Sequence, residues 1–71
     1  MPFHEWITSL GVPAVCKLLN VGHNTVYLWR DLQTLPKPRM MKKVVTVTHG
    51  LVSYESIIEP YLAHKRNANK G

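Results

Sequence analysis

The segment over residues 13–32 constrains the fold most, because it predicts two short helices separated by only a few residues. Pro13 stands at a favoured position for the start of the first helix. The apolar stripe of this helix consists of Val15, Leu18 and Leu19. The second helix should run over about residues 23–32, and the prolines of "TLPKP" should end it. Two short helices joined by a turn of about three or four residues form a helix-turn-helix.

The residues around the predicted turn have the properties that a helix-turn-helix requires. Cys16 is small enough for the second helix to cross the first closely, and Asn20 enters the left-handed backbone region more easily than most residues. Apolar Val21 can fill the angle between the helices. Val26 and Trp29 are three positions apart and can anchor the second helix against the first. The sequence therefore predicts a helix-turn-helix around this turn.

The second helix should present a polar side to solvent if its anchors face the core, because each residue turns the helix by about 100°. A recognition helix places its N-terminal residues in the major groove of DNA. Asparagine can pair with adenine N6 and N7, and a tyrosine ring or a leucine can contact a thymine methyl group. The predicted base contacts are His23, Asn24, Tyr27 and Leu28. The alternatives are that the polar residues are only solvated, that Tyr27 packs in the core or at a dimer surface, and that Leu28 contacts another protein.

The charge of the chain favours a polyanionic partner. Nine Lys and Arg residues against four Asp and Glu residues give a formal net charge of +5, which is typical of small nucleic-acid-binding domains. Gly22 leaves backbone N–H groups free near the start of the second helix, where a phosphate can bind. The predicted phosphate contacts are Gly22, Thr25, Lys17, Arg30, Lys37, Arg39, Lys42 and Lys43. The alternative for each cation is a solvated surface charge.

Other classes of function have less support in the sequence. The histidines are spread widely without an HxxxH or CxxC companion, so we expect no metal and no cofactor. The acidic residues form no paired-carboxylate motif, and we expect no enzyme. A single cysteine excludes an internal disulfide framework and fits a reducing cytoplasm. No apolar run reaches the roughly 20 residues of a membrane helix, and no secretory signal is evident. A protein-interaction module is the main rival from another class.

The rest of the chain predicts one domain over residues 1–64 and a polar basic tail over residues 65–71. A first helix should end near Gly11, and its apolar residues are Phe3, Trp6, Ile7 and Leu10. Ser53 should cap a last helix that Pro60 can break or kink. We expect a mainly α domain of about five short helices.

Residues 43–54 permit a second architecture. Met40, Val44 and Val47 have helical spacing, but "VVTVT" is rich in β-branched residues. The "HG" that follows could turn this segment into a hairpin with "LVSY". The alternative to the mainly α fold is therefore an α+β domain with a C-terminal β-hairpin over residues 43–54. We favour the all-helical form.

The segment "AVCKLLNVGHNTVYLW" resembles the pattern "AxAKALGVSxxAVxxW" of the small Cro-type repressors of temperate phages. "LPKPR" resembles the proline-led entry into their next helix, and "VTHGLVSYESI" resembles their "xTGGxVTxExL" segment. The likeness covers about residues 3–60. It departs from the family where Asn20 replaces the turn glycine, where Gly22 replaces the Ser or Thr cap, and where Leu28 replaces a polar or basic residue.

The resemblance implies a dimeric repressor that binds double-stranded operator DNA in the cytoplasm of a bacterial host cell, at the nucleoid. Cro-like proteins occur in all-helical form and with a C-terminal hairpin, so both architectures stay open. A second resemblance involves three segments, which are "TVYLWRDLQTLPKP", "VVTVTHGLVSY" as a possible wing, and "ESIIEPYLAHKR". These segments look like phage excisionases and AlpA-type winged helix-turn-helix regulators. Some phage proteins of this size both repress and direct excision, so the two functions can overlap.

Overall fold

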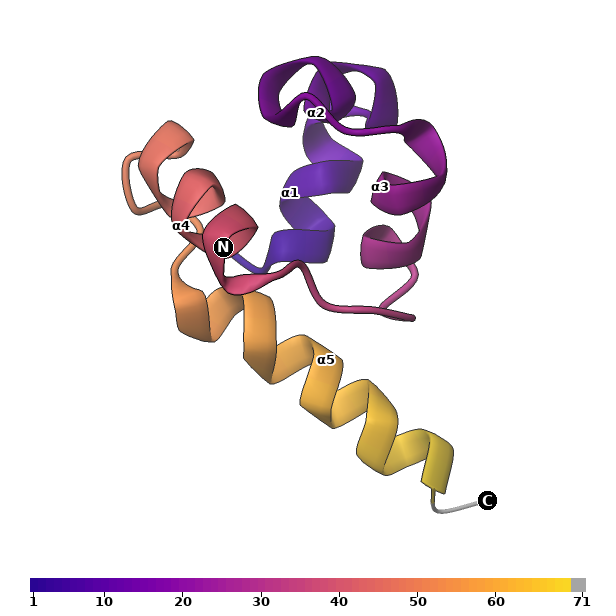
Figure 1. Cartoon of the computed structure of the whole chain (residues 1–71). Coiled ribbons are helices and arrows are strands. Elements are labelled where there is room, and N and C mark those ends of the chain that lie inside the picture. Colours follow the sequence, from indigo (N-terminus) through magenta and orange to yellow (C-terminus); the bar gives the residue numbers. More distant parts are fainter. Residues whose placement is uncertain (70–71) are drawn as a thin grey trace.

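The computed structural model describes residues 1–69, which form five helices and no strand. The helices are α1 (Phe3–Leu10), α2 (Val12–Leu19), α3 (His23–Arg30), α4 (Pro38–Val47) and α5 (Tyr54–Asn69). Figure 1 shows α1 in the middle, with α2 above it, α3 and α4 on opposite sides and α5 below. The predicted mainly α fold of about five helices is confirmed.

The core forms around α1, which packs against α2, α3 and α5. Phe3, Trp6 and Ile7 of α1 are buried. The Phe3 ring stacks on Trp6 with 6.0 Å between the ring centroids and lies 5.7 Å from the ring of Trp29 in α3. This aromatic contact joins the first helix to the third.

The apolar stripes of α1 and α2 were predicted only in part. The buried residues of α2 are Val12, Val15, Cys16 and Leu19. Leu18, which the sequence placed on this stripe, is 48% exposed, because it lies one step of about 100° away from Leu19. Leu10 is 43% exposed in the last turn of α1. Two leucines of the expected core thus face solvent.

The connection between α2 and α3 has the predicted geometry. Asn20 adopts a left-handed conformation with φ 55° and ψ 52°. The N–H of Val21 donates to the carbonyl of Cys16 at 3.1 Å, which closes the end of α2. The Val21 side chain is half-buried against the core, and Val26 and Trp29 of α3 are buried. The predicted plug and anchors are therefore confirmed.

The third helix ends at Arg30, two residues earlier than the sequence predicted. Leu32 has a φ of 59°. Its N–H donates to the carbonyl of Trp29 at 3.1 Å, and the N–H of Gln33 donates to the carbonyl of Leu28 at 2.9 Å. These two bonds form a Schellman motif, which stops the helix before Pro36.

The hairpin and wing alternatives over residues 43–54 are wrong. Met41 and Val44 are buried at helical spacing in α4, so burial decides the structure of this β-branched segment. The Thr48 hydroxyl donates to the carbonyl of Val44 at 2.8 Å and accepts from the N–H of Val52 at 3.2 Å. The N–H of Gly50 donates to the carbonyl of Val45 at 2.9 Å. These bonds end α4 and turn the chain towards α5.

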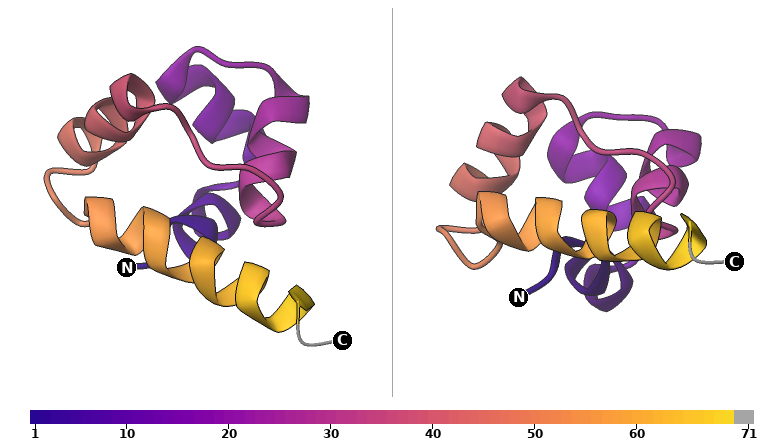
Figure 2. Two further views of the ribbon diagram at one scale, coloured as in Figure 1. Left: turned by 60° about the horizontal axis from the view of Figure 1, so that its bottom comes forward. Right: turned by 90° about the horizontal axis from the view of Figure 1, so that it is seen from below.

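The last helix begins where the sequence predicted, since the Ser53 hydroxyl oxygen accepts from the N–H of Ser56 at 3.1 Å. Ile57 anchors α5 in the core, and α5 packs on α1 and α4 (Figure 2). The helix continues through Pro60 to Asn69. Residues 65–69 of the predicted polar tail are therefore helical, while residues 70 and 71 lie outside the described part. Within residues 1–69, no helix is long and apolar enough to span a membrane.

Candidate nucleic-acid interface

The outward side of α3 carries the four residues predicted to contact bases. His23, Asn24, Tyr27 and Leu28 are all exposed. At about 100° per residue, these four positions fall within an arc of about 140° around the helix axis. Tyr27 is 41% and Leu28 44% exposed, so this side of α3 presents two large apolar groups to solvent beside its polar residues. The structure thus brings the four side chains to one solvent-facing side of α3.

The N-terminus of α3 has no side-chain cap. Gly22 occupies the cap position in an extended conformation, with φ −76° and ψ 160°. Nothing lies within 4 Å of the position that a Cβ on Gly22 would take. The N–H groups of a first helical turn have no partner within their helix, so those of α3 remain suited to bind a phosphate.

Replacing Gly22 by serine should stabilise the fold by about 0.5–1 kcal/mol, because the hydroxyl caps α3 and the glycine entropy of the unfolded chain is reduced. The measurement is urea unfolding followed by circular dichroism. Gly22→Ala is the matched control, since it restricts the backbone without supplying a cap. Equal stability of the serine and alanine variants would contradict the uncapped geometry.

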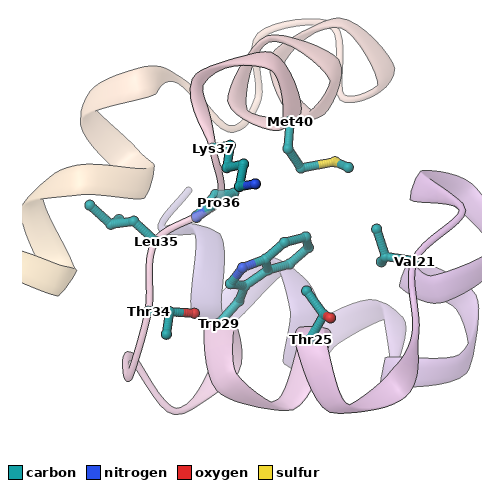
Figure 3. Close-up of a pocket in the computed structure, with 8 residues that line it drawn as sticks. All are labelled: Val21, Thr25, Trp29, Thr34, Leu35, Pro36, Lys37 and Met40. Atoms are coloured by element: carbon teal, nitrogen blue, oxygen red, sulfur yellow. The ribbon is translucent and has the colours of Figure 1, made fainter.

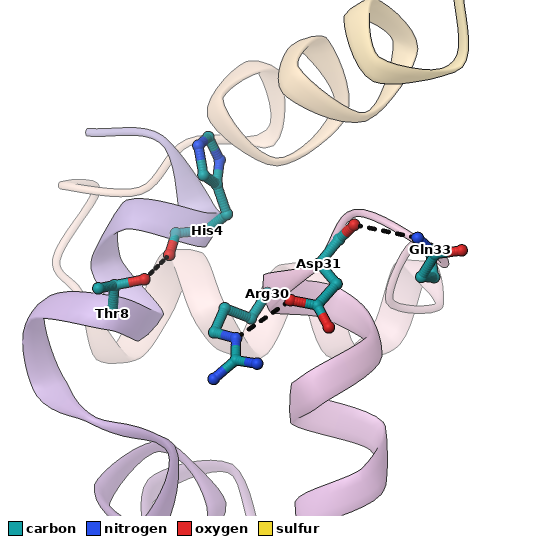
Figure 4. Close-up of polar contacts among 5 residues, drawn as sticks. All are labelled: His4, Thr8, Arg30, Asp31 and Gln33. Carbon is teal, nitrogen blue, oxygen red and sulfur yellow. Dashed lines mark hydrogen bonds and ion pairs between the residues drawn. The ribbon is translucent and has the colours of Figure 1, made fainter. Parts of the chain in front are cut away.

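Arg30 lies along α3 between two neighbouring side chains. Its Nε is 3.2 Å from Asp31 Oδ1 (Figure 4). Its guanidinium carbon lies 4.9 Å from the centroid of the Tyr27 ring. Both members of the ion pair are substantially exposed, at 40% and 54%, so the pair adds little stability. The ion pair instead helps to position Arg30, whose guanidinium lies over the ring of Tyr27, a predicted base contact.

Four further predicted phosphate contacts are cations on other elements, and of these Lys37 lines a cavity together with Thr25 of α3. Lys17 lies in the last turn of α2, Lys37 precedes α4, and Arg39 and Lys42 lie on α4. All four side chains are exposed, and within the part of the chain that the structure describes none forms an ion pair. Such cations are free to contact phosphates.

Lys43, also predicted to contact phosphate, has a partner within the chain. Its Nζ donates to the carbonyl of Leu19 at 3.1 Å. The last carbonyls of a helix have no partner within it and lie at the negative end of the helix dipole. Lys43 therefore ties α4 to the C-terminal end of α2, next to the turn that leads into α3.

Replacing Lys43 by methionine should destabilise the fold by about 1 kcal/mol, because a charge-assisted hydrogen bond is lost while the aliphatic chain is kept. Lys42→Met is the control, because Lys42 is an exposed lysine at the neighbouring position. It should change stability by less than about 0.5 kcal/mol. Equal urea midpoints for the two variants would argue against a stabilising contact at Leu19.

The sequence did not predict a cavity of about 320 Å³ beside α3. Figure 3 shows its lining residues, which are Val21, Thr25, Trp29, Thr34, Leu35, Pro36, Lys37 and Met40. The cavity brings together Thr25 and Lys37, which were predicted separately as phosphate contacts. The sequence predicts the segment "TLPKP" as a helix breaker and an entry into the next helix, and its apolar pair Leu35 and Pro36 is the signal that could have indicated a packed connection.

The free cysteine and the possible metal ligands of the chain form no further site within the described residues. Cys16 is a buried free thiol in the core. Within the described residues, no group of three or more His, Cys, Asp or Glu side chains is placed to hold a metal ion. The candidate interface consists of the outward side of α3 and the exposed cations named above. No protein-family model, curated protein or solved structure matches the chain.

Proposed function

We propose that the protein is a sequence-specific regulator that binds double-stranded DNA and represses transcription in the genetic switch of a phage or prophage. The observation that carries the proposal is the solvent-facing side of α3, which is anchored from behind by the buried Val26 and Trp29. Two side chains with hydrogen-bonding groups, His23 and Asn24, occupy its first turn. The first turn is the part of a recognition helix that reaches base edges.

The roles of the residues follow from their positions. Asn24 binds an adenine edge, and His23 donates to a purine N7 or to a phosphate. Tyr27 and Leu28 contact thymine methyl groups. Phosphates bind to the backbone and side-chain groups of Gly22, Thr25, Lys17, Arg30, Lys37, Arg39 and Lys42. Lys43 can join them while it donates to the carbonyl of Leu19, because its ammonium group has two further N–H donors.

Repression requires that the protein occupy its operator firmly enough to exclude RNA polymerase. We propose a homodimer, because two α3 helices can then enter successive major grooves about one helical turn, roughly 34 Å, apart. A dimer also suits so short a chain, which buries a small core. The protein acts in the cytoplasm of the bacterial host, at the nucleoid. The similarity of residues 3–60 to Cro-type repressors supports this function.

The all-helical fold favours a repressor over an excisionase. The resemblance to winged excisionases and AlpA-type regulators drew on a wing over residues 43–54, and that segment forms the end of α4 and a turn. The remaining likeness, in "TVYLWRDLQTLPKP" and "ESIIEPYLAHKR", overlaps the segments that also resemble the Cro-type proteins. We therefore propose repression as the primary function.

Footprinting of the purified protein on the DNA around its own gene, with a salt titration, tests the function. We expect protected inverted repeats that overlap a promoter, and affinity that falls steeply with salt through counterion release. Direct repeats on bent DNA near an attachment site would instead identify an excisionase. Absence of protection at every salt concentration would overturn DNA binding and favour a protein-interaction module.

A further inference from the structure

The cavity beside α3 has the size and lining of a small-molecule site. Its volume of about 320 Å³ lies at the lower end of the range for ligand pockets, about 300–1,000 Å³. The wall is formed by three separate parts of the chain: the turn and inner side of α3, the connection over residues 34–37, and the start of α4. Such a site can accept a molecule of one or two rings.

The floor of the cavity is apolar. The Trp29 ring forms one side, and Met40 faces it from α4 (Figure 3). Leu35 and Pro36 close the cavity on the connection, and Val21 closes it at the turn. Trp29 is 5% exposed and so offers only a small part of its ring to the cavity, but aromatic and thioether groups both make favourable contacts with a planar aromatic ring. These groups therefore favour a flat apolar ligand over water.

The polar groups at the cavity all suit an anion. Lys37 brings an ammonium group, and Thr25 and Thr34 bring hydroxyl groups that can donate hydrogen bonds. None of the four acidic residues of the sequence lines the cavity. Figure 3 shows the Lys37 ammonium above the Trp29 ring, so one ligand can contact both groups. The charge of the site is thus complementary to a single carboxylate.

We propose that this cavity binds a small planar aromatic carboxylate, with its ring against Trp29 and Met40 and its carboxylate on Lys37. The hydroxyl groups of Thr25 and Thr34 provide further donors to the carboxylate. The site contains none of the four predicted base contacts, but it shares Thr25 and Lys37 with the proposed phosphate contacts, so a bound carboxylate would compete with a DNA phosphate there. Binding of the ligand itself requires no DNA, so the proposal stands whether or not the protein binds DNA.

The test is an NMR titration of the full chain with 2-naphthoate and, separately, with its neutral analogue 2-naphthamide. We expect 2-naphthoate to shift the Trp29 indole N–H, the Met40 methyl and the Thr25 methyl signals together. The amide should bind about fivefold more weakly, since an exposed lysine contributes up to about 1 kcal/mol to an ion pair. Shifts confined to other surfaces, or none at millimolar probe, would overturn the site.

Variants separate the charge of Lys37 from its place in the fold. In Lys37→Gln, 2-naphthoate and 2-naphthamide should bind equally, while the thermal unfolding curve stays unchanged. Lys42→Gln removes an exposed lysine of α4 that does not line the cavity, so it should keep the fivefold preference. Loss of the preference in both variants would show a general charge effect and would overturn the assignment to Lys37.

Discussion

Replacing Trp29 by alanine should destabilise the protein by about 3–5 kcal/mol, which is the usual loss for a buried tryptophan. The side chain is 5% exposed and contacts Phe3 of α1, with 5.7 Å between the ring centroids. It also forms a side of the cavity, so its removal would enlarge an existing space. A core as small as this one supplies about 3–5 kcal/mol of stability in total. We therefore expect the variant to be largely unfolded at 25 °C.

The experiment compares circular dichroism and urea unfolding of Trp29→Ala, Trp29→Phe and Leu28→Ala. Phenylalanine keeps an aromatic contact with Phe3, so this variant should remain folded with a lower urea midpoint. Leu28 is 44% exposed on the same helix, and its truncation should change stability by less than about 0.5 kcal/mol. A cooperative transition for Trp29→Ala within about 1 kcal/mol of the natural chain would mean that α3 is not anchored by this ring.

The local features of the fold could be predicted because neighbouring residues determine them. Asn20 tolerates the left-handed conformation that the turn requires, and Ser53 supplies the cap of α5. The spacing of Val26 and Trp29 defined which side of α3 is buried and hence which side is free. The predicted side of α3 followed from helical geometry alone.

The features that could not be predicted depend on residues far apart in the sequence. The bond from Lys43 to Leu19 spans 24 positions, and nothing about a lysine on a helix distinguishes it from its exposed neighbour Lys42. The cavity arises from three segments that meet only in the folded chain. The choice between a helix and a hairpin at residues 43–54 likewise depends on the burial of Val44. This burial is a tertiary contact, which the β-propensity of single residues cannot predict.

Replacing Asn24 by alanine should remove discrimination at one base pair of the binding site, by about 1–3 kcal/mol. The amide offers a donor and an acceptor that pair together with adenine and with no other base in the major groove. Because Asn24 is exposed, its removal should leave the stability of the fold within about 0.5 kcal/mol. The measurement is binding to a set of operators in which each position of the protected site is changed in turn.

Lys42→Ala is the matched comparison, since it removes an exposed residue from a different element. It should weaken binding to every sequence alike and reduce the slope of log affinity against log salt by about 1. The two variants therefore separate a base contact from a phosphate contact within one assay. If Asn24→Ala kept both the affinity and the base preference of the natural chain, α3 would not be the recognition helix, even if footprinting had shown that the protein binds DNA.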